Sequence, residues 1–236
     1  MFTESIKYYD LIYSALGKNY QQESDKLHRF IKLYKRSKGK RLLDVACGTG
    51  GHLQYLQKYY QVEGLDLSRQ FLRLARQKLP QIPFQCGNML DFKLNRSFDI
   101  VICLFSSIGY TRNFSQLVKT VQNMKYHLRP GGLLIIEPWL FPGEYKTGTV
   151  HAAIVDQPDL KIARINTSKI KGKFSVIVFH YLIAKSSGVK YFTEKHILRL
   201  FEQEEYLKVF KTCQLKTVYD PAGLTERGLY IGINQT

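Results

Sequence analysis

The chain has 236 residues, of which 44% are hydrophobic and 23% charged, so it can bury enough apolar surface to fold rather than stay disordered. Its 35 Lys and Arg residues outnumber its 19 Asp and Glu residues, which leaves a net charge of +16. This charge favours an anionic partner: nucleic acid, a phosphorylated small molecule or an acidic membrane surface.

The cysteines and the apolar runs indicate the compartment. The four cysteines form no Cys-x-x-Cys pair, so the spacing of a zinc site is absent and we expect no metal. The apolar runs are too short for a membrane span, which needs about 20 residues. The N-terminal segment also lacks the basic and then apolar pattern of a signal peptide. We therefore expect free thiols, no membrane contact and a cytoplasmic location.

In chain order, the first half alternates between helical patterns and short apolar runs. Because strands that alternate with helices form βαβ units, this half predicts a parallel sheet. The continuously apolar strands fit a sheet that is covered on both faces. Helices are expected at 20–36, 52–60, 69–79 and 114–128, and strands at 41–46, 62–67, 84–86, 99–104 and 133–136.

The pattern changes after Pro142. Residues 150–196 alternate partly between apolar and polar side chains and are punctuated by turn residues, which predicts an antiparallel meander. A helix at 202–212 and strands at 215–219 and 228–233 follow. We interpret the chain as one α/β domain over 1–236. Its parts are a parallel core (37–142), an antiparallel β insertion (143–200) that serves the substrate or a dimer, and a final helix and strands (201–236).

The sharpest motif is the run LLDVACGTG, which ends at Gly50. Glycines at the end of a first strand let the backbone approach a ligand, at the edge where open α/β sheets bind ligands. Asp66 stands at the end of the second strand, where an acid can accept both hydroxyls of a ribose. The spacing differs from the G-x-G-x-x-G of dinucleotide folds and suits a small cationic nucleoside better than a pyrophosphate. The alternative is a tight turn without a ligand.

The stretches LLDVACGTGGHL, GLDLS, CGNMLDF, FDIVICLFSSIGY and HLRPGGLLIIEPWLFP together resemble the class I S-adenosylmethionine-dependent methyltransferases. More closely, the chain is similar to the bacterial N,N-dimethyltransferases that act on dTDP-linked amino sugars in antibiotic biosynthesis. The likeness covers nearly the whole chain, and the FSSIGY, EPW-x-FP and RGLY tracts are its narrower signals. It implies a Rossmann-like sheet of seven strands with an antiparallel β insertion near the C-terminus.

The resemblance implies S-adenosylmethionine as cofactor and S-adenosylhomocysteine as its product. Asp44, Ala46 and Gly48 match the first cofactor motif, near the methionine end of the cofactor. Asp66 matches the acid that binds ribose, which is Glu in the sugar enzymes. Leu104 follows the fourth strand and is expected near the cofactor.

Two cofactor positions depart from the family pattern. Asn88 and Met89 match an Asp-Met pair that clamps adenine, and Asn keeps an acceptor oxygen but loses the charge. Leu16 stands where these enzymes tend to carry a basic residue that meets the cofactor carboxylate. Lys18 or Tyr20 is therefore expected to substitute for it.

On the substrate side, the resemblance matches Tyr13 to a tyrosine that faces the sugar and Tyr110 to a position near the amine. For both tyrosines the alternative is core packing. Arg227 matches an arginine that suits a phosphate, and its alternative is a surface ion pair with Glu226.

Further substrate contacts are expected beside the first group. Trp139, Tyr145 and Lys146 fall where the sugar nucleotide approaches. His180 and His196 lie in the antiparallel insertion, and His180 is assigned to the substrate site. For both histidines the alternative is a structural, hydrogen-bonded role.

The expected reaction is an in-line transfer of a methyl group from a sulfonium to an unprotonated amine. Such a transfer needs positioning and the exclusion of water, so we expect no essential catalytic base and assign Tyr110 an orienting role. The expected substrate is a small-molecule amine, with or without a diphosphate, and the related sugar enzymes suggest a homodimer.

Three other functions stay open at this point. Methylation of another small amine is suggested by departures such as Leu140, where the sugar enzymes have a second tryptophan. An RNA methyltransferase or nucleic-acid binder is suggested by the charge of +16. It is opposed by the even spread of Lys and Arg and by the absence of an Asn/Asp-Pro-Pro-Tyr tract after the fourth strand. A catalytically silent cofactor-binding protein is opposed by the intact first motif.

Overall fold

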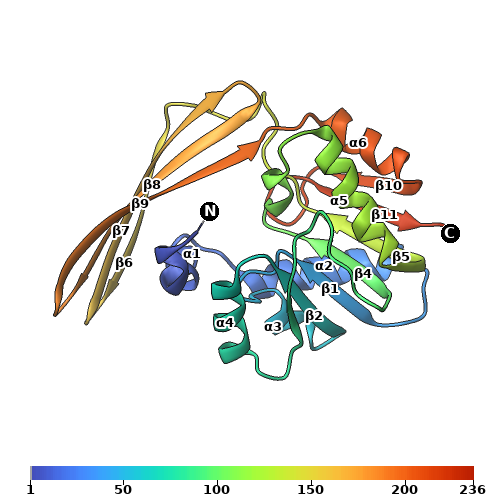
Figure 1. Cartoon of the computed structure of the whole chain (residues 1–236), viewed down its shortest axis with the longest axis horizontal. Coiled ribbons are helices and arrows are strands. Elements are labelled where there is room, and N and C mark those ends of the chain that lie inside the picture. The colour runs from blue at the N-terminus through green and yellow to red at the C-terminus, as the bar shows by residue number, and fades with distance from the viewer. Residues whose placement is uncertain (1) are drawn as a thin grey trace.

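The body of the molecule is a seven-stranded sheet with helices on both faces, and a four-stranded antiparallel sheet projects from it (Figure 1). The computed structural model describes residues 2–236. The strands of the body are β1 (Arg41–Val45), β2 (Gln61–Asp66), β3 (Phe84–Cys86), β4 (Phe98–Cys103), β5 (Leu128–Ile136), β10 (Leu215–Asp220) and β11 (Leu229–Asn234).

The strand order is β10-β11-β5-β4-β1-β2-β3. Strands β1 to β5 run parallel, whereas β11 runs antiparallel to both β5 and β10. All six residues of β4 are buried, as expected for a strand in the middle of a sheet that is covered on both faces. The predicted fold class, a Rossmann-like sheet of seven strands with an antiparallel insertion, is confirmed.

Two apolar clusters attach the helices to the sheet. One cluster joins α5 and α6 to one face through residues such as Val121 and Val209. The other joins α2, α3 and α4 to the opposite face through residues such as Leu27, Leu53 and Leu72. The helices are α2 (Tyr20–Tyr34), α3 (Leu53–Leu56), α4 (Arg69–Lys78), α5 (Phe114–Tyr126) and α6 (Gln203–Thr212).

Two elements differ from their predicted length. The helix expected at 52–60 is the single turn α3, which ends at Leu56, and residues 57–60 form turns that lead into β2. Strand β5 begins at Leu128, before the predicted 133–136. Gly131 allows this because its φ of +74° is a conformation that side-chain-bearing residues rarely adopt.

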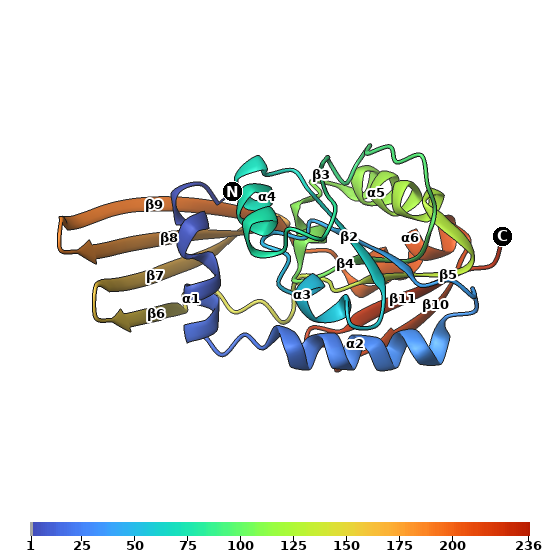
Figure 2. The same cartoon turned by 90° about the horizontal axis from the view of Figure 1, so that it is seen from below.

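The N-terminal segment forms two short elements that the sequence did not predict, the 3₁₀ turn η1 (Glu4–Tyr8) and the helix α1 (Tyr9–Ala15). Helix α1 lies between the body and the projecting sheet (Figure 1) and crosses the strands of that sheet (Figure 2). Asp10 ties it to the body, because this carboxylate accepts a hydrogen bond from Thr49 Oγ1 (2.7 Å) and pairs with Lys78 (3.1 Å). The helix therefore covers the glycine turn after β1.

The projecting sheet has an inner and an outer face. Its inner face packs against α1 through Ile162, Phe179 and Tyr181, which belong to one apolar cluster with Ile12. Its strands are β6 (Val150–Gln157), β7 (Leu160–Lys171), β8 (Phe174–Lys185) and β9 (Gly188–Arg199), paired in that order. Over residues 2–236, no helix is both long and apolar enough to cross a membrane.

Candidate active site

The glycine turn after β1 opens a cavity at the carboxyl edge of the sheet. Ala46 and Gly48 have φ values of +63° and +56°, and strain at a non-glycine residue such as Ala46 is typical of functional sites. A Cβ atom added to Gly48 would meet no atom within 4 Å, so open space lies beside its backbone. Tyr20, Leu104 and Phe105 line the same cavity.

Two buried carboxylates lie beside this turn. Asp66 accepts hydrogen bonds from the backbone N–H groups of Gly48 (2.9 Å) and Ser68 (2.8 Å), one on each oxygen. Burial raises the pKa of Asp66, and these backbone bonds oppose the rise. Asp44 lines the cavity, and no hydrogen-bond donor from residues 2–236 meets its carboxylate. Burial and the charge of Asp66 raise the pKa of Asp44.

This donor and acceptor set fits S-adenosylmethionine. The cofactor carries a cationic methionine end and a ribose with two hydroxyls. Asp44 offers an unpaired carboxylate for the cation, and Asp66 keeps a free lone pair on each oxygen for the hydroxyls. Because Gly48 has no side chain and open space lies beside it, a ligand can approach its backbone closely. Of the predicted cofactor residues, the structure gathers Tyr20, Asp44, Ala46, Gly48 and Leu104 around one cavity, with Asp66 adjoining it.

The two candidates to replace a basic residue at Leu16 lie together. Leu16 itself is exposed, whereas Lys18 is buried with its ammonium 3.8 Å from the ring centre of Phe105 and 5.2 Å from that of Tyr20. Glu23 pairs with Lys18 (2.6 Å). Burial lowers the pKa of Lys18, and the Glu23 carboxylate opposes this effect. Lys18 therefore lies behind Tyr20 and Phe105 of the cavity wall, with its charge paired to Glu23.

The pair predicted to hold adenine follows β3. Asn88 Oδ1 accepts a hydrogen bond from the backbone N–H of Leu90 (3.0 Å) and closes a local turn. Met89 packs against the core on the α5 side of the sheet. The adjoining Gly87 N–H bonds the carbonyl of Asp66 (3.0 Å), which places the pair beside Asp66 but outside the cavity wall. The adenine role stays a prediction.

The turn after β4 lies between the cavity at the glycine turn and the predicted substrate residues. Phe105 and Ser106 both have positive φ, +50° and +63°, so this turn is strained. Glu137 holds it in place, because this fully buried carboxylate accepts bonds from the Phe105 backbone N–H (2.6 Å) and from Thr225 Oγ1 (2.5 Å). The sequence prediction named the EPW tract but gave Glu137 no role.

Arg227 lies at the substrate side of this turn. Its guanidinium is 5.5 Å from the ring centre of Phe105 and 5.3 Å from that of Trp139, and it donates a hydrogen bond to Ser106 Oγ (3.2 Å). Within residues 2–236, no carboxylate lies within 4 Å of it, so the alternative ion pair with Glu226 is absent. The result is a half-buried cation whose charge no acid neutralises.

The projecting sheet adds a second arginine that the sequence prediction missed. Arg164 on β7 is only 6% exposed, and its guanidinium lies 5.2 Å from the ring centre of Tyr13 and 4.8 Å from that of Phe179. The ring of Tyr13 in turn lies 5.0 Å from that of Phe105. Tyr13 thus stands between the sheet and the strained turn. Only the strand register could have indicated that Arg164 faces inward.

Tyr110 belongs to the 3₁₀ turn η2 (Ser107–Tyr110), and its hydroxyl lies 2.6 Å from His196 Nδ1 on β9. Burial raises the pKa of Tyr110 and lowers that of His196 to about 4, so both side chains are uncharged near neutral pH. The structure therefore pairs the predicted orienting residue with a histidine that the prediction had not assigned to the site.

Three predicted substrate residues lie elsewhere or at the margin. His180 is on the outer face of the sheet, where it bonds Tyr191 (2.7 Å), because it neighbours the inward-facing Tyr181 and side chains alternate along a strand. Its assignment to the site is therefore not supported. Lys146 is exposed and contributes a backbone carbonyl to Thr149. Tyr145 lies beside Trp139, at 6.1 Å between ring centres.

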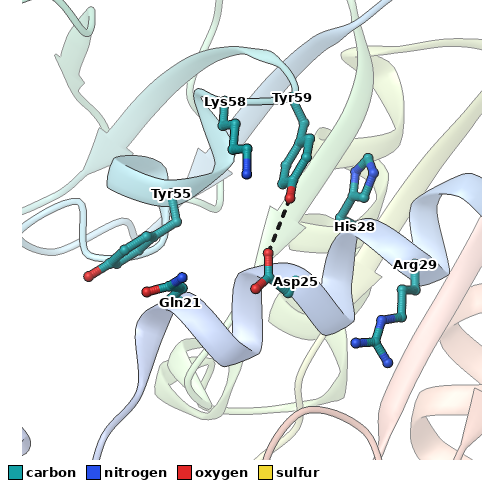
Figure 3. Close-up of a pocket in the computed structure, with 7 residues that line it drawn as sticks. All are labelled: Gln21, Asp25, His28, Arg29, Tyr55, Lys58 and Tyr59. Atoms are coloured by element: carbon teal, nitrogen blue, oxygen red, sulfur yellow. Dashed lines mark hydrogen bonds between the residues drawn. The ribbon is translucent and has the colours of Figure 1, made fainter.

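A second hollow lies between α2 and the segment after α3 (Figure 3). There the hydroxyl of Tyr59 donates to Asp25 (3.3 Å), and the ring of His28 stacks on Tyr59 at 3.8 Å. His28 Nδ1 also bonds the hydroxyl of Tyr60 (2.8 Å). This hollow shares no lining residue with the cavity at the glycine turn.

Comparison with known proteins gives the relatives of this chain. A family model described as a methyltransferase domain matches residues 42–132. The chain is 36% identical over 227 residues to a dTDP-3-amino-3,4,6-trideoxy-alpha-D-glucopyranose N,N-dimethyltransferase of Streptomyces venezuelae, covering 95% of each protein. It is 34% identical over 226 residues to a dTDP-4-amino-2,3,4,6-tetradeoxy-D-glucose N,N-dimethyltransferase of Saccharopolyspora spinosa, covering 95% of this chain and 90% of that protein.

Solved structures agree with these relatives. The crystal structure of Streptomyces venezuelae DesVI superposes with a TM-score of 0.92 at 34% identity over 99% of both chains. An S-adenosylmethionine-bound amino pentose methyltransferase from Micromonospora echinaspora superposes with a TM-score of 0.88 at 31% identity, over 99% of this chain and 98% of that chain.

Proposed function

Since the chain belongs to the family of S-adenosylmethionine-dependent methyltransferases that includes the dTDP-amino-sugar N,N-dimethyltransferases, we propose that it dimethylates the amine of a nucleotide-linked amino sugar. The relatives with about 35% identity over nearly the whole chain carry such names, and they support a sugar nucleotide over a nucleic acid as the partner.

The observation that carries the proposal is the setting of Arg227. A guanidinium that is stacked on Phe105 and Trp139 and has no acid beside it is a ready partner for an anion. Its planar fork suits the oxygens of a phosphate. Arg164 adds a second cation on the other side of Tyr13. An uncharged amine would leave both cations without a counter-charge, whereas a diphosphate would meet them.

When bound, S-adenosylmethionine would supply an electrophilic methyl group for transfer to the amine nitrogen. Asp44 and Asp66 would hold the cofactor, with Tyr20 in the wall of the adjoining cavity. Arg227, with Trp139 and Tyr13 beside it, anchors the anionic end of the substrate. Because the reaction needs only a positioned, unprotonated amine, no residue is required to act as an essential base.

The experiment compares wild type and Arg227→Ala with a dTDP-linked amino sugar and with the same amino sugar lacking the nucleotide. Loss of a charge-assisted bond costs about 1.5–3 kcal/mol, which is roughly 10- to 150-fold in KM. The value of kcat should change far less, because the phosphates bind equally in the ground and transition states. Arg29→Ala, an exposed arginine on α2, is the matched control and should behave as wild type.

Two outcomes would count against the proposal. If Arg227→Ala keeps the wild-type KM for the nucleotide sugar, the phosphate role is wrong. If wild type methylates only the free amine, methylation of another small amine takes the place of the proposed function. Cofactor affinity, measured by calorimetry, should be unchanged in either variant.

We also propose that the enzyme is a homodimer that pairs through the outer face of its projecting sheet. Ile154, Leu182 and Tyr191 are exposed by 60%, 47% and 57% and lie in one row across the strands, with Ala163 between the first two. An apolar row of this kind is typical of an interface. A cytoplasmic location stays a prediction, which cell fractionation tests.

A further inference from the structure

A buried pair of neutral side chains joins the body of the enzyme to the projecting sheet. The hydroxyl of Tyr110, at the end of η2, lies 2.6 Å from Nδ1 of His196 on β9. The rings of Phe2 and Phe179 pack against the imidazole at 4.2 Å and 5.2 Å between centres. His196 is 2% exposed, and its Nε2 meets no partner among the residues that the structure describes.

The charged neighbours of His196 on the inner face do not compete for its ring. Glu194 is fully engaged, because its two oxygens accept bonds from the backbone N–H and hydroxyl groups of Thr3 and Ser5. Arg164 is directed at the rings of Tyr13 and Phe179. The hydroxyl of Tyr110 is therefore the one hydrogen-bond partner that the imidazole has within residues 2–236.

A single hydrogen lies between the Tyr110 oxygen and His196 Nδ1. The atom that carries it decides whether the Tyr110 hydroxyl can donate a hydrogen bond to a substrate or can only accept one. If His196 carries its hydrogen on Nδ1, the hydroxyl of Tyr110 stays free to donate and would bind the lone pair of the amine. If the hydrogen is on Nε2, the hydroxyl donates to Nδ1 and its oxygen keeps only acceptor lone pairs. The second arrangement keeps the amine lone pair available for the methyl group and places on Nε2 a hydrogen that meets no acceptor within residues 2–236.

We propose that His196 is a positioning residue: it takes the hydroxyl hydrogen of Tyr110, so that the Tyr110 oxygen accepts an N–H of the substrate amine and turns the amine lone pair toward the methyl group. The inference rests on the proposed function, because it needs an amine at this place. Tyr110 ends the turn η2, whose first residue, Ser107, lines the cavity at the glycine turn. A Cβ atom added to Gly109 of the same turn would lie 3.2 Å from Cβ of Trp139, so η2 runs from the cavity to the predicted substrate residues.

This arrangement has a consequence for the two successive transfers. A primary amine has two N–H groups, so other contacts can hold one of them. The monomethylated intermediate has a single N–H, and the direction of its lone pair depends on that bond alone. The dimethylated product has no N–H and loses the bond to Tyr110. Loss of the hydrogen bond between Tyr110 and His196 should therefore slow the second methyl transfer more than the first.

The experiment uses His196→Leu, Tyr110→Phe and the double variant. The matched control is His180→Leu, because His180 bonds Tyr191 in the same geometry (2.7 Å) on the outer face of the same sheet. Loss of about one hydrogen bond should lower kcat roughly tenfold with little change in KM. His196→Leu and Tyr110→Phe should also release more monomethyl product. The double variant should be no slower than Tyr110→Phe, and His196→Gln, which keeps an acceptor, should recover part of the rate.

A measurement without turnover tests the proton directly. In wild-type protein with ¹⁵N-labelled histidine, the nitrogen chemical shifts of His196 should show the hydrogen on Nε2. Hydrogen on Nδ1 would overturn the inference, as would a wild-type rate and product ratio in His196→Leu. Calorimetric cofactor binding shows whether His196→Leu is folded. If it is not, the rate and product ratio of Tyr110→Phe test the inference instead. Should wild type methylate no nucleotide-linked amine, the proposed function fails, whereas the nitrogen shifts still decide the state of the pair.

Discussion

Asp66 shows how single residues are prepared for a ligand before it binds. The backbone N–H groups of Gly48 and Ser68 each bond one oxygen, which fixes the orientation of the carboxylate and leaves a free lone pair on each oxygen. Asp44 is buried beside it and lines the cavity, where its carboxylate can meet the cationic end of a cofactor.

Asp66→Ala should weaken S-adenosylmethionine binding at least tenfold, because two hydrogen bonds to a charged group are lost, each worth about 1.5–3 kcal/mol. Calorimetric titration measures this. Asp156→Ala, an exposed carboxylate on β6, should bind as wild type does. An unchanged affinity in Asp66→Ala, with the fold intact by circular dichroism, would contradict the ribose assignment.

His196 should also make stability depend on pH. Burial lowers its pKa to about 4, from about 6.5 in an unfolded chain. Between these values the unfolded chain binds a proton that the folded chain does not, so this contribution to stability is present above pH 6.5 and is lost as pH falls toward 4. The loss is roughly 3 kcal/mol. Urea unfolding at pH 7, 6 and 5 should show a shallower loss for His196→Leu than for wild type, and equal slopes would refute this role.

At the scale of elements, the site depends on a short N-terminal helix that could not persist alone. Helix α1 has seven residues, fewer than an isolated helix needs, so its contacts keep it folded. Asp10 fixes it to Thr49 in the glycine turn and to Lys78 on α4. Tyr13 is placed by the same helix, so the cofactor turn and the substrate side share one support.

Asp10→Ala should loosen α1 without unfolding the body. We expect faster hydrogen exchange over residues 4–15 and roughly a three- to tenfold weaker cofactor affinity, the effect of about one hydrogen bond. Exchange detected by mass spectrometry, with and without cofactor, measures both. Asp25→Ala on α2 is the control. Exchange as slow as that of wild type in Asp10→Ala would show that apolar packing alone holds the helix.

At the scale of the whole molecule, the projecting sheet has two different faces for two purposes. Its inner face carries Arg164 and His196 toward the body, and its outer face exposes an apolar row. Figure 1 shows that the sheet extends beyond the body, so a second copy could cover the outer face without meeting the active site.

Leu182→Lys together with Ile154→Lys should convert a dimer into a monomer, because a charge in an apolar interface is left without a partner. Light scattering coupled to size-exclusion chromatography gives the mass. The control is Lys190→Ala together with Lys161→Ala, two exposed positions of the same sheet. A wild-type monomer at micromolar concentration, or a dimer that both leucine and isoleucine substitutions leave intact, would contradict the interface.

The sequence by itself determined the strands of the body, the glycine turn and the two acids. These features depend on local chemistry: apolar runs form buried strands, and glycines with an acid at strand ends define the ligand edge of a parallel sheet. For the same reason the predicted cofactor residues Asp44, Ala46 and Gly48 line one cavity at this edge, and Tyr20 joins them there.

Only the tertiary structure decided which residues of the antiparallel segment reach the site. A shift of one residue turns every side chain of a strand to the other face. The register is fixed by long-range pairing, and it turns His196 and Arg164 toward the body and His180 away from it.

Long-range contacts also decided the positions of Lys18 and Glu137. Lys18 is buried whereas Leu16 is exposed, and the partners of Glu137, Phe105 and Thr225, lie far away in the chain. Contacts between distant segments leave no local pattern, and that is why the sequence could name the cofactor side of the site more fully than the substrate side.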